Sequence, residues 1–206
     1  MRYNQSRQQL YFEVFVKNPA ATSSSDRILA AATLIAQAHG YSGLNVRTLA
    51  EEVGIKAASL YHHFPSKADL AAAVATRYWE DSAATLEALA AATENPLASL
   101  RSYPQTFRKT LENDNRMCLS SFMAAEYDDL PEHVQREVLK FADVNVAWLA
   151  RMLTGTGAVP PAQVETRARA VFAAVAGAQL MARGRADITL FDQLIEAYQA
   201  SGLLPA

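Results

Sequence analysis

Basic and hydroxyl side chains between residues 47 and 67 have the types that suit contact with a nucleic acid. Arginine and lysine neutralise phosphate groups, and hydroxyl groups bind phosphate oxygens or base edges. Small side chains among them let a backbone approach base edges closely. The candidates for such contacts are Arg47, Thr48, Lys56, Ala57, Ser59, Tyr61, His62, His63 and Lys67.

Two short helices, predicted over residues 46–53 and 56–64, are the elements that position these side chains. Asn45 can cap the first helix, and Gly54 can end it in the left-handed conformation that glycine adopts cheaply. In the second helix Leu60 and Phe64 share an inward face, which leaves the polar side chains pointing outward. Pro65 ends this helix.

A third helix is predicted to follow at once, because Ser66 with Asp69 three residues later forms a capping-box pattern. This long helix should continue to about residue 92. A close turn between two short helices suits DNA, since the major groove, roughly 12 Å wide, accepts one helix while the other crosses the backbone. The pattern predicts a helix-turn-helix.

The segment from about residue 26 to 79 resembles the DNA-binding domain of the TetR family of transcriptional repressors. Asn45 stands where that family more often has threonine or serine, and it keeps the capping function. The residues that carry the resemblance are Ile28, Ala32, Gly40, Tyr41, 46–50, 53–55, 60–64, Ser66, Lys67 and Leu70.

The resemblance implies a homodimer that binds a palindromic double-stranded DNA operator and is released by a small-molecule effector. It places the nine residues above at positions that touch DNA, with the positions of Tyr61 and Lys67 on phosphates. Repression is the expected mode of action, and activation is the alternative. The effector, the operator and the regulated genes are not specified by the sequence.

Composition favours an all-α fold, because only eight glycines and eight prolines occur among 206 residues and they lie between periodic segments. We expect an N-terminal three-helix helix-turn-helix domain over residues 26–80. A C-terminal helical ligand-binding and dimerisation domain should cover residues 81–206. Residues 1–25 are interpreted as an extension, either disordered or an arm that adds DNA or dimer contacts.

The net charge of −2 does not by itself indicate nucleic-acid binding. Residues 26–80 carry five basic and five acidic side chains, whereas residues 81–206 carry eleven and fifteen. Binding should therefore depend on a few well-placed cations in each subunit of a dimer. The absence of a long apolar run predicts a cytoplasmic protein with no membrane association.

Five further helical segments are expected over residues 96–113, 117–127, 131–153, 162–183 and 189–201. Apolar stripes on the last two predict a four-helix bundle with the same helices of a second subunit, as the resemblance also implies. The alternative is that both stripes close the core of the single chain. The residues expected at the dimer interface are Val171, Phe172, Val175, Gln179, Phe191, Leu194, Ile195 and Tyr198.

Aromatic and sulfur-containing side chains in the C-terminal region can line a pocket for an apolar or aromatic effector. The lone cysteine, Cys118, follows Arg116 and can alternatively act as a redox or electrophile sensor, although a buried structural role is the commoner one. The candidate pocket residues are Tyr103, Phe107, Met117, Cys118, Phe122, Met123, Tyr127, Trp148 and Met152.

An enzyme is not expected, since no serine or cysteine has a recognisable base partner and no phosphate-binding loop is present. No cofactor is expected. Neighbouring His62 and His63 point about 100° apart on a helix and do not form a metal site. A helical interaction module that does not bind DNA is a further alternative, but it leaves Arg47, Ser59 and Lys67 without a role.

Overall fold

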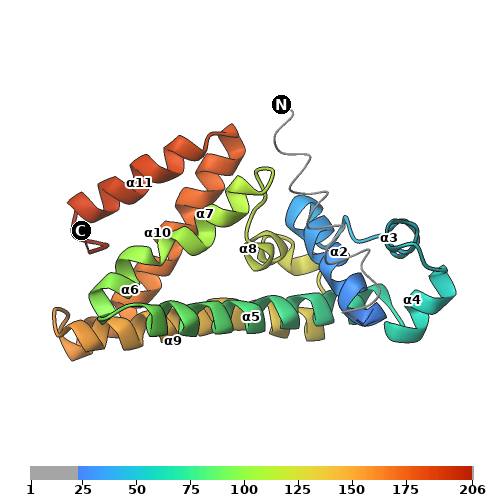
Figure 1. Ribbon diagram of the computed structural model, residues 1–206, viewed down its shortest axis with the longest axis horizontal. Helices are drawn as coiled ribbons and strands as arrows, with labels where there is room; N and C mark the ends of the chain where they lie inside the picture. The colour runs from blue at the N-terminus through green and yellow to red at the C-terminus, as the bar shows by residue number, and fades with distance from the viewer. Residues whose placement is uncertain (1–22, 206) are drawn as a thin grey trace. The chain divides into compact units, whose positions relative to one another are not determined.

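A computed structural model describes residues 23–205, and these residues form helices with no strand among them (Figure 1). The all-α prediction is confirmed. Most of the expected extension at residues 1–25 lies outside the described residues. The helices are α2 (Ser24–His39), α3 (Val46–Val53), α4 (Ala57–His63), α5 (Lys67–Ala92), α6 (Pro96–Ser102), α7 (Pro104–Glu112), α8 (Leu119–Ala124), α9 (Glu132–Thr156), α10 (Val164–Arg185) and α11 (Ile188–Ala200), with 3-10 turns at Tyr127–Asp129 and Pro161–Gln163.

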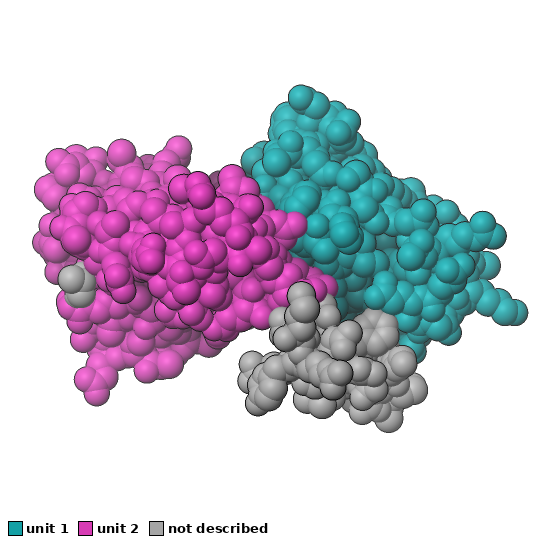
Figure 2. Space-filling model, turned by 90° about the horizontal axis from the view of Figure 1, so that it is seen from above, with its two compact units in different colours: residues 1–78, 119–139 teal, residues 79–118, 140–206 magenta. Residues whose placement is uncertain are grey.

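The chain packs as two compact units, which Figure 2 colours separately. Unit 1 comprises the described residues up to 78 together with residues 119–139, and unit 2 comprises residues 79–118 and the chain from residue 140. Helices α5 and α9 each contribute to both units. Residues 119–139 therefore pack with the N-terminal helices, and the functional division at residue 80 stays a prediction.

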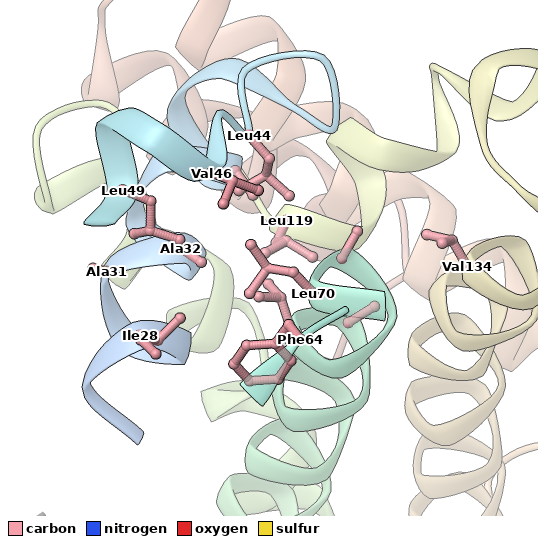
Figure 3. Packing of buried hydrophobic residues seen from close by; sticks show 14 of the residues in the cluster. Ile28, Ala31, Ala32, Leu44, Val46, Leu49, Phe64, Leu70, Leu119 and Val134 are labelled. Atoms are coloured by element: carbon pink, nitrogen blue, oxygen red, sulfur yellow. The ribbon is translucent and has the colours of Figure 1, made fainter. Parts of the chain in front are cut away.

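Unit 1 is built around one hydrophobic cluster (Figure 3). Ile28 of α2, Leu49 of α3 and Leu70 of α5 are fully buried in it, so the three helices share a core. Leu119 and Val134 of the later segment are fully buried in the same cluster. Removing their apolar surface from water stabilises the attachment of this segment.

The start of α2 follows from a capping box. The backbone N–H of Asp26 donates to Oγ of Ser23 at 3.1 Å, and the Ser23 hydroxyl donates to the Asp26 carboxylate at 2.8 Å. This second hydrogen bond lowers the pKa of Asp26. Arg77 of α5 also pairs with Asp26 at 2.9 Å, and it thereby ties α5 to the first turn of α2.

Unit 2 packs α6, α7, α10 and α11 with the remaining parts of α5 and α9. Tyr103 and Phe191 are its largest fully buried side chains. Arg108 of α7 donates to both carboxylate oxygens of Asp192 on α11, at 2.8 and 3.0 Å. Such a bidentate ion pair fixes the orientation of both side chains more tightly than a single hydrogen bond does.

The single helix expected over residues 96–113 is wrong: α6 ends at Ser102 and α7 begins at Pro104. Proline has no backbone N–H, so it cannot donate to the carbonyl of Leu100 and suits the first position of a new helix. The helix expected over residues 117–127 is also shorter, and it covers only Leu119–Ala124.

Within residues 23–205, no helix combines the length and the apolar character needed to cross a lipid bilayer.

Candidate nucleic-acid interface

Polar side chains of α3 and α4 lie on the surface of unit 1. Arg47 and Thr48 in the first turn of α3 are exposed, and Tyr61 on α4 is 49% exposed. Leu60 on the opposite face of α4 and Phe64, which directly follows the helix, are buried in the core. The inward and outward faces of α4 are thus those expected from the sequence. The other exposed candidates here are Lys56, Ser59, His62 and His63, whereas Ala57 is half-buried.

The start of α3 is fixed by Asn45, whose side-chain oxygen accepts hydrogen bonds from the N–H groups of Arg47 and Thr48 at 2.9 and 3.1 Å. Because Val46 and Leu49 are buried, the helix cannot rotate about its axis without exposing apolar surface. The capped start therefore holds Arg47 and Thr48 on the outer face.

The turn between α3 and α4 depends on Gly54, which has the left-handed φ of 75°. Its N–H bonds the carbonyl of Glu51 at 3.2 Å, and the N–H of Ile55 bonds that of Ala50 at 2.9 Å. A Cβ atom at position 54 would meet nothing within 4 Å, so the need for glycine is conformational and not steric.

Replacing Gly54 with alanine should lower the free energy of unfolding by about 1 kcal/mol, because an L-residue in the left-handed region costs about that much. Thermal unfolding should show a midpoint lower by about 2–4 °C. Gly54→Asn is the matched control, since asparagine tolerates this conformation, and its loss should be smaller. Equal midpoints for glycine and alanine would contradict this account of the turn.

Lys67 begins α5 beside the α2–α3 loop. Its Nζ atom donates to the carbonyl of Ser42 at 3.2 Å and lies 4.4 Å from the centre of the Tyr41 ring. Ser66 caps the helix, with its Oγ accepting from the N–H of Asp69 at 3.1 Å. The cap expected from Ser66 is therefore present, and it places Lys67 at the first position of a helix that faces the same loop.

His62 and His63 place their ring centres 5.9 Å apart in an edge-on arrangement, and both are exposed. Among the residues that the structure describes, no group of three histidine, cysteine or acidic side chains is placed to hold a metal ion. The pair is positioned as a polar surface on the last turn of α4.

Glu126, which no sequence pattern marks as a site residue, is also part of this region. Its carboxylate accepts hydrogen bonds from the backbone N–H groups of Tyr41 and Ser42, which lie 85 and 84 residues earlier in the chain. No periodicity or local motif signals such a contact, because only the tertiary fold brings the two segments together.

The candidate effector-pocket residues are divided between the two units. Phe122, Met123 and Tyr127 belong to unit 1, and Met123 is part of its hydrophobic cluster. Tyr127 is 50% exposed, which separates it from the buried residues of the set. The members in unit 2, all buried, are Tyr103, Phe107, Met117, Cys118, Trp148 and Met152.

Polar contacts within unit 2 orient two of these aromatic residues. Burial raises the pKa of Tyr103 well above its usual value, and its hydroxyl donates to Oδ1 of Asn145 at 3.0 Å. Trp148 stacks on Tyr103 with ring centres 5.8 Å apart. The indole Nε1 of Trp148 is buried and has no hydrogen-bond partner within the described chain.

Cys118 is buried, with 1% of its surface exposed. Its backbone N–H donates to Oε1 of Gln179 at 3.0 Å, and the amide group of Gln179 donates to the carbonyl of Phe107 at 2.8 Å. A thiol that reacts with oxidants is normally exposed to them. The geometry of Cys118 is that of a structural core residue.

The residues expected at a dimer interface do not form one exposed surface. Val171, Val175, Gln179 and Phe191 are buried in the core of unit 2, in line with the alternative that the stripes close the single chain. Phe172, Leu194, Ile195 and Tyr198 are half-buried. The large exposed apolar side chains on α10 are instead Leu180 and Met181, at 55% and 48%.

An open recess of about 510 Å³ lies where α10 begins and the chain leaves α11. None of the residues expected to line an effector pocket borders it. Its lining residues are Ala162, Gln163, Thr166, Arg167, Ala170, Ser201 and Leu203.

Comparison with known proteins shows similarity to one family of bacterial regulators. A family model described as bacterial regulatory proteins of the tetR family matches residues 28–74, which include α3, α4 and the start of α5. A TetR transcriptional regulator from Legionella pneumophila has a similar structure over 88% of this chain and 98% of its own, with 26% identity and a TM-score of 0.82. Residues 28–74 thus match the tetR family of bacterial regulatory proteins.

Two further proteins that are similar to this chain agree with the match to the tetR family model. A regulator from Agrobacterium tumefaciens is 28% identical, over 86% of this chain and 96% of its own, with a TM-score of 0.80. The HTH-type transcriptional repressor DrrR1 of Streptomyces coeruleorubidus is 41% identical over 54 residues, which are 26% of this chain. The match spans 20% of that relative's length.

The match to the tetR family model confirms the resemblance seen in the sequence, and the proteins that this model describes are regulatory proteins and not enzymes. The matched segment holds all nine candidate nucleic-acid contacts, from Arg47 to Lys67.

Proposed function

We propose that the protein is a DNA-binding transcriptional repressor that acts as a homodimer on a palindromic operator and is released by a small-molecule effector. The observation that carries this proposal is the exposed polar face of α3 and α4, held outward by the buried residues Leu49, Leu60 and Phe64. Contact with phosphates and base edges is the one role that accounts for both the cationic and the hydroxyl groups on this face. The repressor function of DrrR1, part of which is similar in sequence, supports the direction of regulation.

In this proposal α4 enters the major groove and α3 crosses the backbone beside it. The side chains that face the base edges are Ser59, His62 and His63. The small side chain of half-buried Ala57 lets the first turn of α4 approach the DNA closely. Tyr61 and Lys67 bind phosphates, and Lys56 neutralises another at the start of α4. Arg47 and Thr48 reach a phosphate or a base edge from α3.

The second subunit is needed because the DNA-binding surface of a single subunit has few cations. Two reading helices must enter successive major grooves about 34 Å apart to bind both halves of a palindrome. The exposed apolar surface of α10 around Leu180 and Met181 supports dimerisation through this helix, with α11 beside it. Half-buried Leu194 and Tyr198 can complete a four-helix contact.

Effector control is assigned to residues 81–206 and DNA binding to residues 26–80. An effector that binds the released form better by about 2–3 kcal/mol would change operator occupancy substantially. The aromatic set around Tyr103 and Trp148 supports an apolar or aromatic effector. We place this activity in the cytoplasm, where the DNA is.

The two alternative functions have less support. A redox or electrophile sensor at Cys118 needs a thiol that reagents can reach, and this thiol is buried. An interaction module without DNA gives no reason for a cationic and hydroxyl surface on α3 and α4.

The test is fluorescence anisotropy with labelled DNA taken from immediately upstream of the protein's own gene, against unrelated DNA, over a salt series. Tight and sequence-selective binding with a moderate salt dependence, as expected from a few cations in each subunit, supports the proposal. Weak and non-selective binding leads to a genome-wide selection of bound fragments. An empty selection would refute the function.

A further inference from the structure

Glu126 makes an unusual contact with the loop between α2 and α3. Its Oε2 atom lies 2.5 Å from the backbone nitrogen of Tyr41, and its Oε1 atom lies 3.1 Å from that of Ser42. Both carboxylate oxygens thus accept hydrogen bonds from consecutive N–H groups. Hydrogen bonds to a charged acceptor are roughly twice as strong as neutral ones.

Gly40 provides the space for this contact. A Cβ atom at position 40 would lie 2.2 Å from Oε2 of Glu126 and 2.6 Å from the ring of Phe122. Its φ of 67° is also one that other residues rarely adopt. The loop backbone and the 119–126 segment therefore approach each other as closely as the absence of a side chain allows.

The same two loop residues hold Lys67. The carbonyl of Ser42 accepts a hydrogen bond from Nζ of Lys67 at 3.2 Å, and the Tyr41 ring lies 4.4 Å from the ammonium group. A cation above an aromatic face is attracted to it. The loop that Glu126 fixes through its N–H groups fixes the position of the Lys67 ammonium through its carbonyl and its ring.

The segment that carries Glu126 is itself firmly held in unit 1. Leu119 and Met123 are fully buried in the unit 1 cluster, and Leu130 and Val134 follow on the other side of Glu126. This segment lies outside residues 28–74, which the family model matches. A residue far from the DNA-binding motif in sequence is therefore rigidly positioned against it.

We propose that Glu126 is a positioning residue for the DNA interface, which acts through the Tyr41–Ser42 backbone to hold Lys67 where it meets a phosphate. This inference rests on the proposed function, since it needs Lys67 to bind DNA. It makes the C-terminal part of unit 1 a participant in operator binding.

Electrostatic repulsion and the positioning contact predict opposite changes in operator affinity when the Glu126 carboxylate is removed, so the measurement distinguishes them. Removing a carboxylate near DNA lowers repulsion from phosphates and should tighten binding slightly. Loss of the positioning contact in Glu126→Gln should instead weaken operator binding about fivefold to tenfold. Glu132→Gln is the matched control: Glu132 is exposed on the same segment and pairs only with Arg136 among the contacts described, at 3.5 Å.

The experiment measures operator affinity of the full-length protein by fluorescence anisotropy for Glu126→Gln, Lys67→Met and the double variant. If Glu126 acts through Lys67, Glu126→Gln should cause little further loss of operator affinity in a protein that already carries Lys67→Met. Thermal unfolding of each variant gives the temperature range in which all are folded. If Glu126→Gln does not fold, Glu126→Asp replaces it in the cycle, because aspartate keeps the charge but is one methylene too short for both hydrogen bonds.

If the losses of binding free energy in Glu126→Gln and Lys67→Met add up in the double variant, the inference is overturned, and Glu126 contributes to fold stability alone. Unchanged or tighter binding by Glu126→Gln, equal to that of Glu132→Gln, would overturn it as well. In both cases the wild-type protein still binds DNA and Lys67→Met still weakens it, so the proposed function stands. A wild-type protein without selective DNA binding would refute the proposed function and this inference together.

Discussion

The variant that combines Tyr61→Phe with Lys67→Met is expected to bind operator DNA at least about 1,000-fold more weakly than the wild-type protein. Each change removes one proposed phosphate contact, worth about 1–1.5 kcal/mol, and a dimer loses each contact twice. Tyr61 is exposed, and Lys67 is half-buried at the start of α5 outside the hydrophobic cluster, so the fold should be retained. Anisotropy titrations with operator DNA measure the loss.

The salt series gives a second, independent readout of the same variant. Removing one lysine contact per subunit should lower the slope of log affinity against log salt by about two per dimer. Lys109→Met is the control, because Lys109 is an exposed lysine of α7 in unit 2 and its loss changes the net charge equally. The same loss of affinity in both variants would show a non-specific charge effect and contradict the assigned contacts.

Leu180→Asp is expected to convert the dimer into monomers and to reduce operator affinity at least 100-fold. Leu180 is 55% exposed on α10, so a carboxylate there is solvated in the single chain but buried without a partner in a dimer. The penalty of several kcal/mol is incurred twice across a two-fold axis. Analytical ultracentrifugation measures the change in mass, and anisotropy measures the loss of DNA binding.

Leu139→Asp is the matched control for this experiment. Leu139 is exposed to a similar extent, 51%, but lies on α9 and not on α10. This control should remain a dimer and retain its operator affinity. A Leu180→Asp protein that also stays dimeric would exclude this face of α10 from the subunit interface.

Helix ends around the interface were predictable because their signals are local. Asn45, Gly54 and Pro65 act on hydrogen bonds within a few residues of themselves, and the structure places the ends of α3 and α4 at these positions. The break at Pro104 carried the same kind of signal, which the sequence analysis did not apply to residues 96–113.

The facing of α10 was not predictable, because apolar residues occur around much of its circumference. Val171, Val175 and Ala178 are fully buried, whereas Leu180 and Met181 are exposed. Hydropathy is similar on both faces, so only the neighbours of the helix decide which face forms the core. The eight residues chosen for an interface therefore include four that the core of unit 2 encloses.

The sequence by itself determined the resemblance to the TetR family, the all-α class and the outward-facing polar side chains of α3 and α4, because these depend on local capping, periodicity and motif spacing. Only the tertiary structure decided that residues 119–139 pack in unit 1 and that Glu126 binds the Tyr41–Ser42 backbone. The hydrogen bonds of Glu126 join residues more than 80 positions apart. Long-range packing selects them, and neither partner carries a local pattern that identifies the other.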